Sequence, residues 1–312
     1  MTALRVVYGK TLARLGGEIA EIVVLDADLS KSTKTSYFAA EFPHRFHDMG
    51  IAEQDMLATA AGLATGGLIP FASTFAIFGT GRAWEQLRNS ICYPNLNVKL
   101  VATHGGITVG KDGGSHQSVE DLAITRVIPN LRVIVPADGR ETEQVIETIA
   151  RAKGPFYVRL PRGSTPDVHE DPEWRFKLGK ATVLREGGDV TLVACGTMVG
   201  VALEAAALLA AEGLSAGVIN MSTLKPLDHA CLLAAARRSG ALITLEEHSV
   251  IGGLGSAVCE SLAQSHPVPV LRLGVNDQFG QSGDGPELLE HYGLTAAGAA
   301  SLAQQAIRLK QG

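Results

Sequence analysis

Short runs of apolar, β-branched residues alternate with longer runs of helical periodicity, and this alternation restricts the fold more than any other feature. In the first half, strands are expected at residues 22–25, 69–73, 98–103, 133–135 and 157–160. The clearest expected helix covers residues 53–66, where apolar side chains recur every three or four positions before Gly66-Gly67. Such alternation is typical of a parallel sheet covered by helices on both faces. The sequence therefore predicts an α/β fold.

The length of the chain predicts two domains, because one hydrophobic core seldom organises 312 residues. Residues 166–187 are rich in Pro, Gly and charge, which is typical of a linker. Beyond them, strands are expected at 190–195, 216–221, 241–247 and 269–275, and helices at 200–212, 228–238 and 255–264. We predict two doubly wound domains, 1–165 and 188–312, of which the second is smaller.

Composition and charge argue against several classes of protein. A net charge of -5 gives no electrostatic reason to bind nucleic acid. No stretch approaches the ~20 apolar residues that cross a bilayer, and the N-terminus lacks the apolar core of a signal peptide. The four cysteines are scattered without a CxxC pair, so reduced thiols are expected. These observations predict a cytoplasmic protein that binds neither nucleic acid nor membrane.

Unusual residues between positions 50 and 162 mark a candidate site, because ligands of open α/β sheets bind beyond the carboxyl ends of the strands. Glu53 follows Gly50-Ile51-Ala52 at the start of an otherwise apolar helix. Free amides and the helix dipole stabilise a negative charge there. For a lone Glu, charge complementarity with the helix terminus is the simpler interpretation.

Aromatic and histidine side chains supply further candidates. Phe75 and Phe78 lie among small residues and would suit a flat ring, although most Phe side chains belong to a core. His104 follows an expected strand, and Asp112 and His116 share the glycine-rich segment after it. A metal site is the alternative, but these three residues lack a familiar ligand spacing. We therefore predict no metal ligand in this chain.

Three more polar residues lie where anionic ligands bind. Arg162 follows the last expected strand of the first domain, where a guanidinium can hold a phosphate with two hydrogen bonds. Arg5 and Ser32 supply donors near the start of the chain. The glycine turn at 252–256 superficially resembles a nucleotide-binding turn, but its late place in the domain favours tight packing between strand and helix.

Four segments taken together resemble the pyrimidine-binding domain of transketolases. They are HDMGIAEQDMLATAAGLATGG, IPFASTFAIFGTGRAWEQLRNS, THGGITVGKDGGSHQSVEDLA and YVRLPRG. The second domain resembles the C-terminal domain of the same family through GGDVTLVACGTMV and STLKPLD. The family's diphosphate-binding domain, which holds magnesium, has no counterpart in these residues. The chain therefore resembles the C-terminal section of a transketolase encoded as two polypeptides.

This resemblance implies a thiamine-diphosphate-dependent enzyme and assigns cofactor contacts by position. Glu53 would hydrogen-bond N1′ of the aminopyrimidine, and apolar surroundings would favour the protonated carboxyl by desolvation. Phe75 and Phe78 would stack on and flank the ring, and Ile51 would complete the contacts. The family's tyrosine three residues beyond the second phenylalanine is replaced by Gly81, which removes one expected wall of the pocket.

The same resemblance implies the substrate contacts. His104 and His116 would contact substrate oxygens and assist proton transfers, and Asp112 would recognise a hydroxyl group. The residues expected to grip a sugar phosphate are Arg162, Arg5 and Ser32. The implied reaction transfers a two-carbon ketol unit from a ketose phosphate to an aldose phosphate. Mg²⁺ (or Ca²⁺) would be bound mainly by an N-terminal-section partner, in an α2β2 assembly.

Other interpretations stay open at this point. The β subunit of a 2-oxoacid dehydrogenase shares GIAEQ and a similar second domain, whereas STFAIF and KDGGSHQ favour a transketolase. Half of a deoxyxylulose-phosphate synthase shares AEQ and PRG, although that family is usually one long chain. A non-catalytic assembly subunit would keep the fold without the chemistry, and the presence of Glu53, His104 and His116 argues against it. The sequence does not identify the two sugars.

Overall fold

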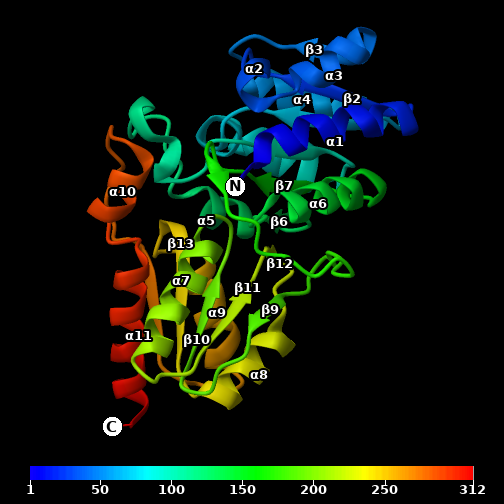
Figure 1. The fold of residues 1–312 in the computed structure, drawn as a ribbon. Coiled ribbons are helices and arrows are strands. Elements are labelled where there is room, and N and C mark those ends of the chain that lie inside the picture. Colours follow the sequence, from blue (N-terminus) through cyan, green and yellow to red (C-terminus); the bar gives the residue numbers. More distant parts are fainter. Residues whose placement is uncertain (312) are drawn as a thin grey trace.

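The chain folds around two mainly parallel sheets with helices on both faces, as the computed structural model shows for residues 1–311. In Figure 1 the first unit, coloured blue to green, lies above the second unit, coloured green to red. The predicted α/β fold with two doubly wound units is confirmed.

The first sheet has seven strands in the order β12-β6-β7-β5-β4-β2-β3. Its strands are β2 (Ile22–Asp26), β3 (Phe46–Asp48), β4 (Ile69–Ser73), β5 (Lys99–Ala102), β6 (Arg132–Ile134), β7 (Phe156–Arg159) and β12 (Thr223–Lys225). All neighbours are parallel except β12, which runs antiparallel to β6. The five strands predicted in this half are present, each boundary within one residue of the prediction.

Helices cover both faces of this sheet. On one face lie α1 (Leu4–Glu18), α3 (Ser36–Glu41) and α6 (Gly139–Arg151), and on the other lie α4 (Glu53–Thr65) and α5 (Asp121–Arg126). Helix α6 begins where the Asp138 side chain accepts a hydrogen bond from the amide of Glu141. It buries Val145, Ile146 and Ile149 completely, and each such side chain contributes roughly 1.5–3 kcal/mol.

Irregular helical turns follow several strands of the first sheet. Short turns are α2 (Ser30–Thr33), η1 (Pro43–Arg45) and η4 (Ile107–Asp112). Two stretches of π-helical backbone, η2 (Phe78–Arg82) and η3 (Gln86–Cys92), follow β4. Wide turns of the π type are frequent at functional sites.

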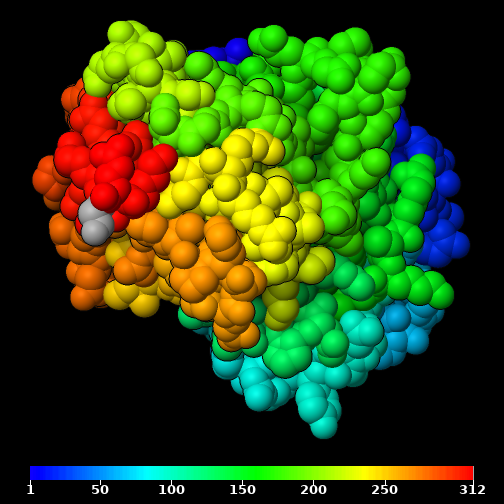
Figure 2. All heavy atoms as spheres, turned by 90° about the horizontal axis from the view of Figure 1, so that it is seen from below, coloured from blue at the N-terminus to red at the C-terminus, as the bar shows by residue number. Residues whose placement is uncertain are grey.

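The second sheet has the order β14-β13-β10-β11-β9. Its elements are β9 (Thr182–Arg185), β10 (Val190–Ala194), α7 (Met198–Ala211), β11 (Ala216–Asn220), α8 (His229–Ser239), β13 (Leu242–Ser249), α9 (Leu254–Ala263), β14 (Val270–Val275), α10 (Gly285–His291) and α11 (Ala296–Gln311). Figure 2 shows the yellow α8 beside the orange α9 on one face, with the red α11 at the edge.

The two units share strands and one continuous core. Strand β12 belongs in sequence to the second half but extends the first sheet. Strand β9 lies within the predicted linker 166–187 and pairs antiparallel with β11. A small sheet joins β1 (Thr2–Ala3) to β8 (Ser164–Thr165). Apolar residues of α4 in the first unit and of α8 and α9 in the second belong to one buried cluster. The domain boundaries stay a prediction.

The glycine turn before α9 serves packing, as expected. Its amides are already bonded within the protein, because the Glu246 carboxylate accepts from Leu254 N at 2.6 Å and from Gly255 N at 2.8 Å. A Cβ atom on Gly253 would lie 2.0 Å from Glu246 Oε2. The four cysteines, all within the described residues, are free. Across residues 1–311, no helix has both the length and the apolar character to cross a membrane.

Candidate active site

Five neighbouring strands of the first sheet end at one edge, and most of the predicted site residues follow them. Glu53 comes after β3, Ser32 after β2, Phe75 after β4, His104 after β5 and Arg162 after β7. Because the strand order is β7-β5-β4-β2-β3, the segments after these strands are neighbours in space. This edge is where ligands of open α/β sheets bind.

The carboxylate of Glu53 is buried at the start of α4, with 1% of the residue exposed. Arg82 Nη1 donates to Oε2 at 2.7 Å, and Thr74 Oγ1 donates a longer bond to Oε1 at 3.4 Å. Both oxygens therefore have a donor, and the negative charge has a cation beside it. Sequence reasoning did not identify Arg82, although it is a charged residue in a stretch of small and apolar ones.

Arg82 also covers an aromatic ring of the predicted site. Its guanidinium carbon lies 4.6 Å from the centroid of the Phe78 ring, and 45% of its side chain is exposed. The wide turn η2 carries both residues. Gly81 leaves open space, since a Cβ atom there would meet the Ile77 side chain at an ordinary 3.6 Å. Where an aromatic wall was expected, the structure instead has a guanidinium stacked on Phe78.

The predicted aromatic and histidine residues form one cluster. The Phe75 and Phe78 rings are nearly parallel, with centroids 6.0 Å apart and an interplanar angle of 15°. His104 stacks on Phe75 at 3.8 Å, and His116 meets the Phe78 ring edge-on at 5.3 Å. Segments that follow β4 and β5 thus converge on one spot.

His104 is held as a neutral imidazole. Its backbone adopts a left-handed conformation with φ of 61°, and its Nδ1 lies 2.8 Å from the hydroxyl of Thr103. Burial, together with the neighbouring charges of Arg5, Arg162 and His116, lowers its pKa to about 3. At neutral pH this ring is therefore a hydrogen-bonding group without charge.

A glycine-rich loop between β5 and α5 carries Asp112 and His116. Gly110 and Gly113 have φ of 84° and 79°, a conformation that favours glycine. Gln117 Nε2 donates to Ile107 O at 2.9 Å, which closes the loop on itself. The same nitrogen donates to the backbone of residue 281 in the second unit, also at 2.9 Å. The loop is thus fixed by contacts within it and from the second unit.

The predicted phosphate-gripping residues also lie close together. Arg5 Nη1 donates to Ser32 O at 2.9 Å, and Arg162 Nη1 lies 3.9 Å from Asp112 Oδ2 while donating to Val109 O. Burial lowers the pKa of Arg5, and the nearby charge of Arg162 lowers it further. Within residues 1–311, the buried Nε of Arg5 has no hydrogen-bond partner. Two neighbouring cations with spare donors suit an anionic group.

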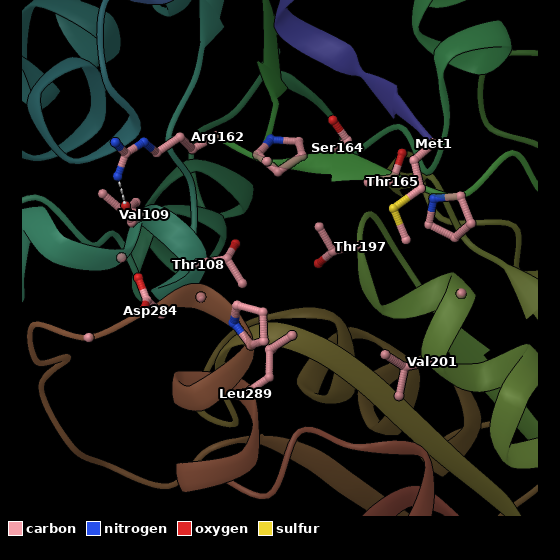
Figure 3. A pocket seen from close by; sticks show the side chains of 18 of the residues that line it. Met1, Thr108, Val109, Arg162, Ser164, Thr165, Thr197, Val201, Asp284 and Leu289 are labelled. Carbon is pink, nitrogen blue, oxygen red and sulfur yellow. Dashed lines mark hydrogen bonds between the residues drawn. The ribbon is translucent and has the colours of Figure 1, made fainter.

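Arg5 and Arg162 also line a cavity of about 760 Å³ between the two units. Its wall includes Thr108 from the glycine-rich loop and Thr197 from the second unit, which Figure 3 shows beside one another. Glu53 does not line this cavity.

The structure leaves one predicted residue apart from this cluster. The Ile51 side chain is 76% exposed, beside the start of α4. Its predicted cofactor contact stays a prediction. Among residues 1–311, no group of three His, Cys, Asp or Glu side chains has an arrangement that could hold a metal ion.

Two family models match this chain. Residues 1–167 match "Transketolase, pyrimidine binding domain", and residues 179–298 match "Transketolase, C-terminal domain". The chain belongs to the transketolase family. The cluster around Glu53 therefore lies in the pyrimidine-binding domain of a thiamine-diphosphate-dependent family, and the cavity-lining Thr197 lies in the transketolase C-terminal domain.

Members of the transketolase family match almost the whole chain. A "Putative transketolase C-terminal section" from Methanocaldococcus jannaschii is 51% identical over 92% of this chain and 90% of its own length. A subunit of an apulose-4-phosphate transketolase from Phocaeicola vulgatus is 36% identical over 99% of this chain and 98% of its own length. A solved "Split gene transketolase, inactive beta4 tetramer" is 55% identical over 99% of both chains, with a TM-score of 0.90. The chain thus corresponds to the C-terminal section of a split transketolase.

Proposed function

We propose that this chain is the subunit of a split transketolase that binds the aminopyrimidine ring of thiamine diphosphate. With its partner it transfers a two-carbon ketol unit from a ketose phosphate to an aldose phosphate. The observation that carries the proposal is the buried carboxylate of Glu53 beside Phe78, within the family's pyrimidine-binding domain.

The residues around Glu53 fit an aminopyrimidine. Arg82 brings a flat, cationic group with N–H donors to this place, and its guanidinium makes two contacts there. It donates to the carboxylate of Glu53 and stacks on the ring of Phe78. An aminopyrimidine needs the same two contacts, which are a hydrogen bond to a carboxyl and an aromatic face. The site therefore accepts a flat, nitrogen-rich ring once Arg82 moves aside.

Glu53 exchanges a proton with the ring through its carboxyl oxygen. Thiamine diphosphate, when bound, supplies a nucleophilic carbon and an electron sink. A carboxyl group within hydrogen-bond reach of a weakly basic ring nitrogen can exchange a proton with it, and Glu53 is buried where that ring would lie. The apolar faces of Phe75 and Phe78 keep water away from this proton.

The two histidines orient the substrate. Because Nδ1 of His104 lies beside the hydroxyl of Thr103, Nε2 is the nitrogen that hydrogen-bonds a substrate oxygen. His104 does so without carrying a charge, since its pKa is lowered to about 3. His116, edge-on to Phe78, is placed to pass a proton to or from a neighbouring oxygen.

Arg5 and Arg162 hold the anionic end of the sugar. Their proximity and their shared place in the cavity wall suit a phosphate group. Two relatives support an anionic sugar. One is the apulose-4-phosphate transketolase from Phocaeicola vulgatus, and the other is a "6-deoxy-6-sulfo-D-fructose transketolase subunit" from Clostridium sp. that is 44% identical. Asp112, 38% exposed and near Arg162, recognises a hydroxyl of the same sugar.

A second chain supplies the diphosphate and magnesium sites, in an α2β2 assembly in the cytoplasm. Two relatives support this partner, because one is described as a "C-terminal section" and the other as one subunit of its transketolase. The solved relative described as an "inactive beta4 tetramer" supports the inactivity of this chain alone. The four free cysteines agree with a reducing compartment.

The proposal is tested by purifying this chain alone and together with an N-terminal-section transketolase chain encoded beside it. Ketol transfer is measured with thiamine diphosphate, Mg²⁺ and a panel of phosphorylated and sulfonated ketoses. We expect transfer by the pair and none by this chain alone. Transfer by the isolated chain, or none by the pair across the panel, contradicts the proposal.

A synthase activity is the second candidate, because 1-deoxy-D-xylulose-5-phosphate synthases are also related. The synthase from Geobacter sulfurreducens is 40% identical, and this chain spans 48% of its length. The same assay with pyruvate as donor and an aldose phosphate as acceptor separates the two reactions. Decarboxylation of pyruvate without ketol transfer favours the synthase.

A further inference from the structure

Glu247 is a buried carboxylate of the second unit that binds the glycine-rich loop of the first. It lies near the end of β13 and is 2% exposed. Its Oε1 accepts hydrogen bonds from both the backbone amide and the hydroxyl of Thr108, each at 2.6 Å. Its Oε2 accepts from Thr197 Oγ1 at 2.7 Å. Two of its three donors therefore belong to the loop that carries Asp112 and His116.

The backbone of the loop wraps closely around this carboxylate. Gly106 has φ of 86°, and a Cβ atom on it would lie 2.3 Å from Glu247 Oε1. The amide of Gly106 donates to Ser118 O at 2.9 Å, which ties the two ends of the loop together. Arg159 Nη2 donates to both Ser118 O and Glu247 O, at 3.2 and 2.8 Å. Both ends of the loop and Glu247 thus form one hydrogen-bonded assembly.

Figure 1 shows the second-unit helix α10 beside this loop, and Figure 3 shows Thr108 and Thr197 in the cavity wall. Two other contacts of the loop with the second unit are the half-buried bond from Gln117 Nε2 to the backbone of residue 281 and the packing of Ile107 in the apolar cluster of the second unit. The ion pair of Lys111 Nζ with Asp284 Oδ1, at 3.2 Å, has both side chains more than half exposed, and such pairs contribute little. Glu247 differs from these contacts, because it brings a buried carboxylate of the second unit against the backbone of the loop.

We propose that Glu247 is a positioning residue that sets the conformation of the loop bearing Asp112 and His116. The transketolase C-terminal domain thereby contributes to substrate placement without touching substrate. The consequence for catalysis rests on the proposed function, whereas the placement of the loop does not. Displacing a substrate-contacting group by about 1 Å can lower turnover by about 100-fold.

The three converging donors match an ionised carboxylate, which accepts hydrogen bonds at both oxygens and donates none. A Gln side chain would keep these contacts, because its oxygen can stay on Thr108 while its NH₂ group donates to the Thr197 hydroxyl. Glu247→Leu removes both accepting oxygens at a similar size. It therefore leaves the buried Thr108 amide unpaired and releases the loop.

Two threonines give a matched pair of variants. Thr108 and Thr197 are both half-buried, line the same cavity and donate a hydroxyl to the same carboxylate. Thr108 lies in the loop, whereas Thr197 lies before α7. Thr108→Val and Thr197→Val remove the same kind of bond with the same change of shape. Glu246→Gln is a further control, because that buried neighbour bonds the amides before α9 instead.

Hydrogen–deuterium exchange of residues 105–117 in the full-length chain reports the loop directly. We expect Glu247→Leu and Thr108→Val to raise exchange there by about tenfold or more. We expect Thr197→Val and Glu246→Gln to leave it within about twofold of the original chain. Unchanged exchange in Thr108→Val, or equal increases in both threonine variants, contradicts the proposal. This comparison holds even if Glu247→Leu does not fold.

Kinetics of the complex with the partner chain test the catalytic consequence. We expect Thr108→Val to lower kcat by about tenfold without changing the KM for thiamine diphosphate. The proposed binding site of the aminopyrimidine ring, at Glu53, is separate from the loop that carries Thr108. Thr197→Val should keep kcat. A loosened loop with unchanged kcat refutes positioning for catalysis. Failure of the unsubstituted complex to transfer ketol units counts against the proposed function instead.

Discussion

The guanidinium of Arg82 and the carboxylate of Glu53 lie 2.7 Å apart where the strands of the first sheet end. Arg82 also lies 4.6 Å over the ring of Phe78. These are the two contacts that we propose for the aminopyrimidine of thiamine diphosphate. Binding of the cofactor therefore has to replace one flat cation with one flat ring.

Arg82→Met should tighten the binding of thiamine diphosphate to the complex by about fivefold. Met keeps an apolar stem beside Phe78 but removes the ion pair that the ring displaces. A pair with one half-exposed partner contributes about 1 kcal/mol, which corresponds to that factor. Calorimetric titration of the complex with thiamine diphosphate in the presence of Mg²⁺ measures the change.

Arg88→Met is the matched control for this titration. Arg88 lies six residues further on, in η3, with its guanidinium carbon 6.0 Å from the Trp84 ring, and it donates to Asn89 rather than to Glu53. We expect its substitution to leave the dissociation constant unchanged. Weaker binding in Arg82→Met would show that the guanidinium contacts the bound ring rather than competing with it.

His104 should make the protein less stable as the pH falls below about 6.5. Its pKa in the folded chain is about 3, so the unfolded chain binds a proton that the folded chain excludes. The stability gained by burying the neutral His104 ring is fully present above pH 6.5 and is lost as the pH falls toward 3. His104→Asn, whose side chain tolerates the left-handed backbone, removes it.

Guanidinium chloride unfolding at pH 7.5 and pH 5.0 measures this difference. Between these values the original chain should lose about 2 kcal/mol more unfolding free energy than His104→Asn. Equal losses in the two proteins would mean that His104 is protonated in the folded state near pH 6. In that case it could not act as the neutral group that we assign.

Arg162→Gln should raise the KM for phosphorylated ketoses by about 10- to 100-fold and leave kcat within about twofold. A charge-assisted hydrogen bond to phosphate contributes about 1.5–3 kcal/mol to binding. Steady-state kinetics are measured with a phosphorylated ketose and with an uncharged ketose as donor. Only the KM for the phosphorylated donor should rise in Arg162→Gln. Arg151→Gln, which removes a surface pair with Glu18, is the control. Equal responses to both donors would place the phosphate elsewhere.

Gly106→Ala should destabilise the chain by about 2 kcal/mol more than Gly113→Ala. The two glycines have nearly equal backbone angles, with φ of 86° and ψ of -171° at Gly106 and φ of 79° and ψ of -175° at Gly113, so their backbone strain on substitution matches. A Cβ atom on Gly106 meets Glu247 at 2.3 Å, whereas one on Gly113 has its nearest neighbour at an ordinary 3.6 Å. The difference between the two unfolding free energies isolates the clash. Equal values would show that the loop has room to shift.

Much of this site is predictable from the sequence, because its residues come directly after strands. A run such as 69–73 is readable as a buried strand, and parallel strands bring their carboxyl ends to one edge. Phe75 and His104 follow two such neighbouring strands and stack on each other in the structure. Glu53 begins a helix with clear periodicity, so its buried place at the same edge could also be expected.

The missed features depend on long-range contacts or on irregular backbone. Strand β9 has alternating exposure over four residues, and β12 has three residues, too short for a periodic signal. Arg82 reaches Glu53 through a π-helical turn that no sequence period marks. Thr108 and Glu247 lie 139 residues apart in the chain. Their contact follows from how the two units dock.

Replacement of Glu53 by Gln in the reconstituted complex tests the central claim most directly. Gln keeps the shape of the side chain and can still bond Arg82, so folding and assembly should be unchanged, but it cannot exchange a proton with the ring. We expect steady-state ketol transfer to fall by about 10²- to 10⁴-fold at saturating thiamine diphosphate and Mg²⁺. A complex that assembles normally and keeps its full turnover would contradict the assignment of Glu53 as the proton-exchanging acid of this site.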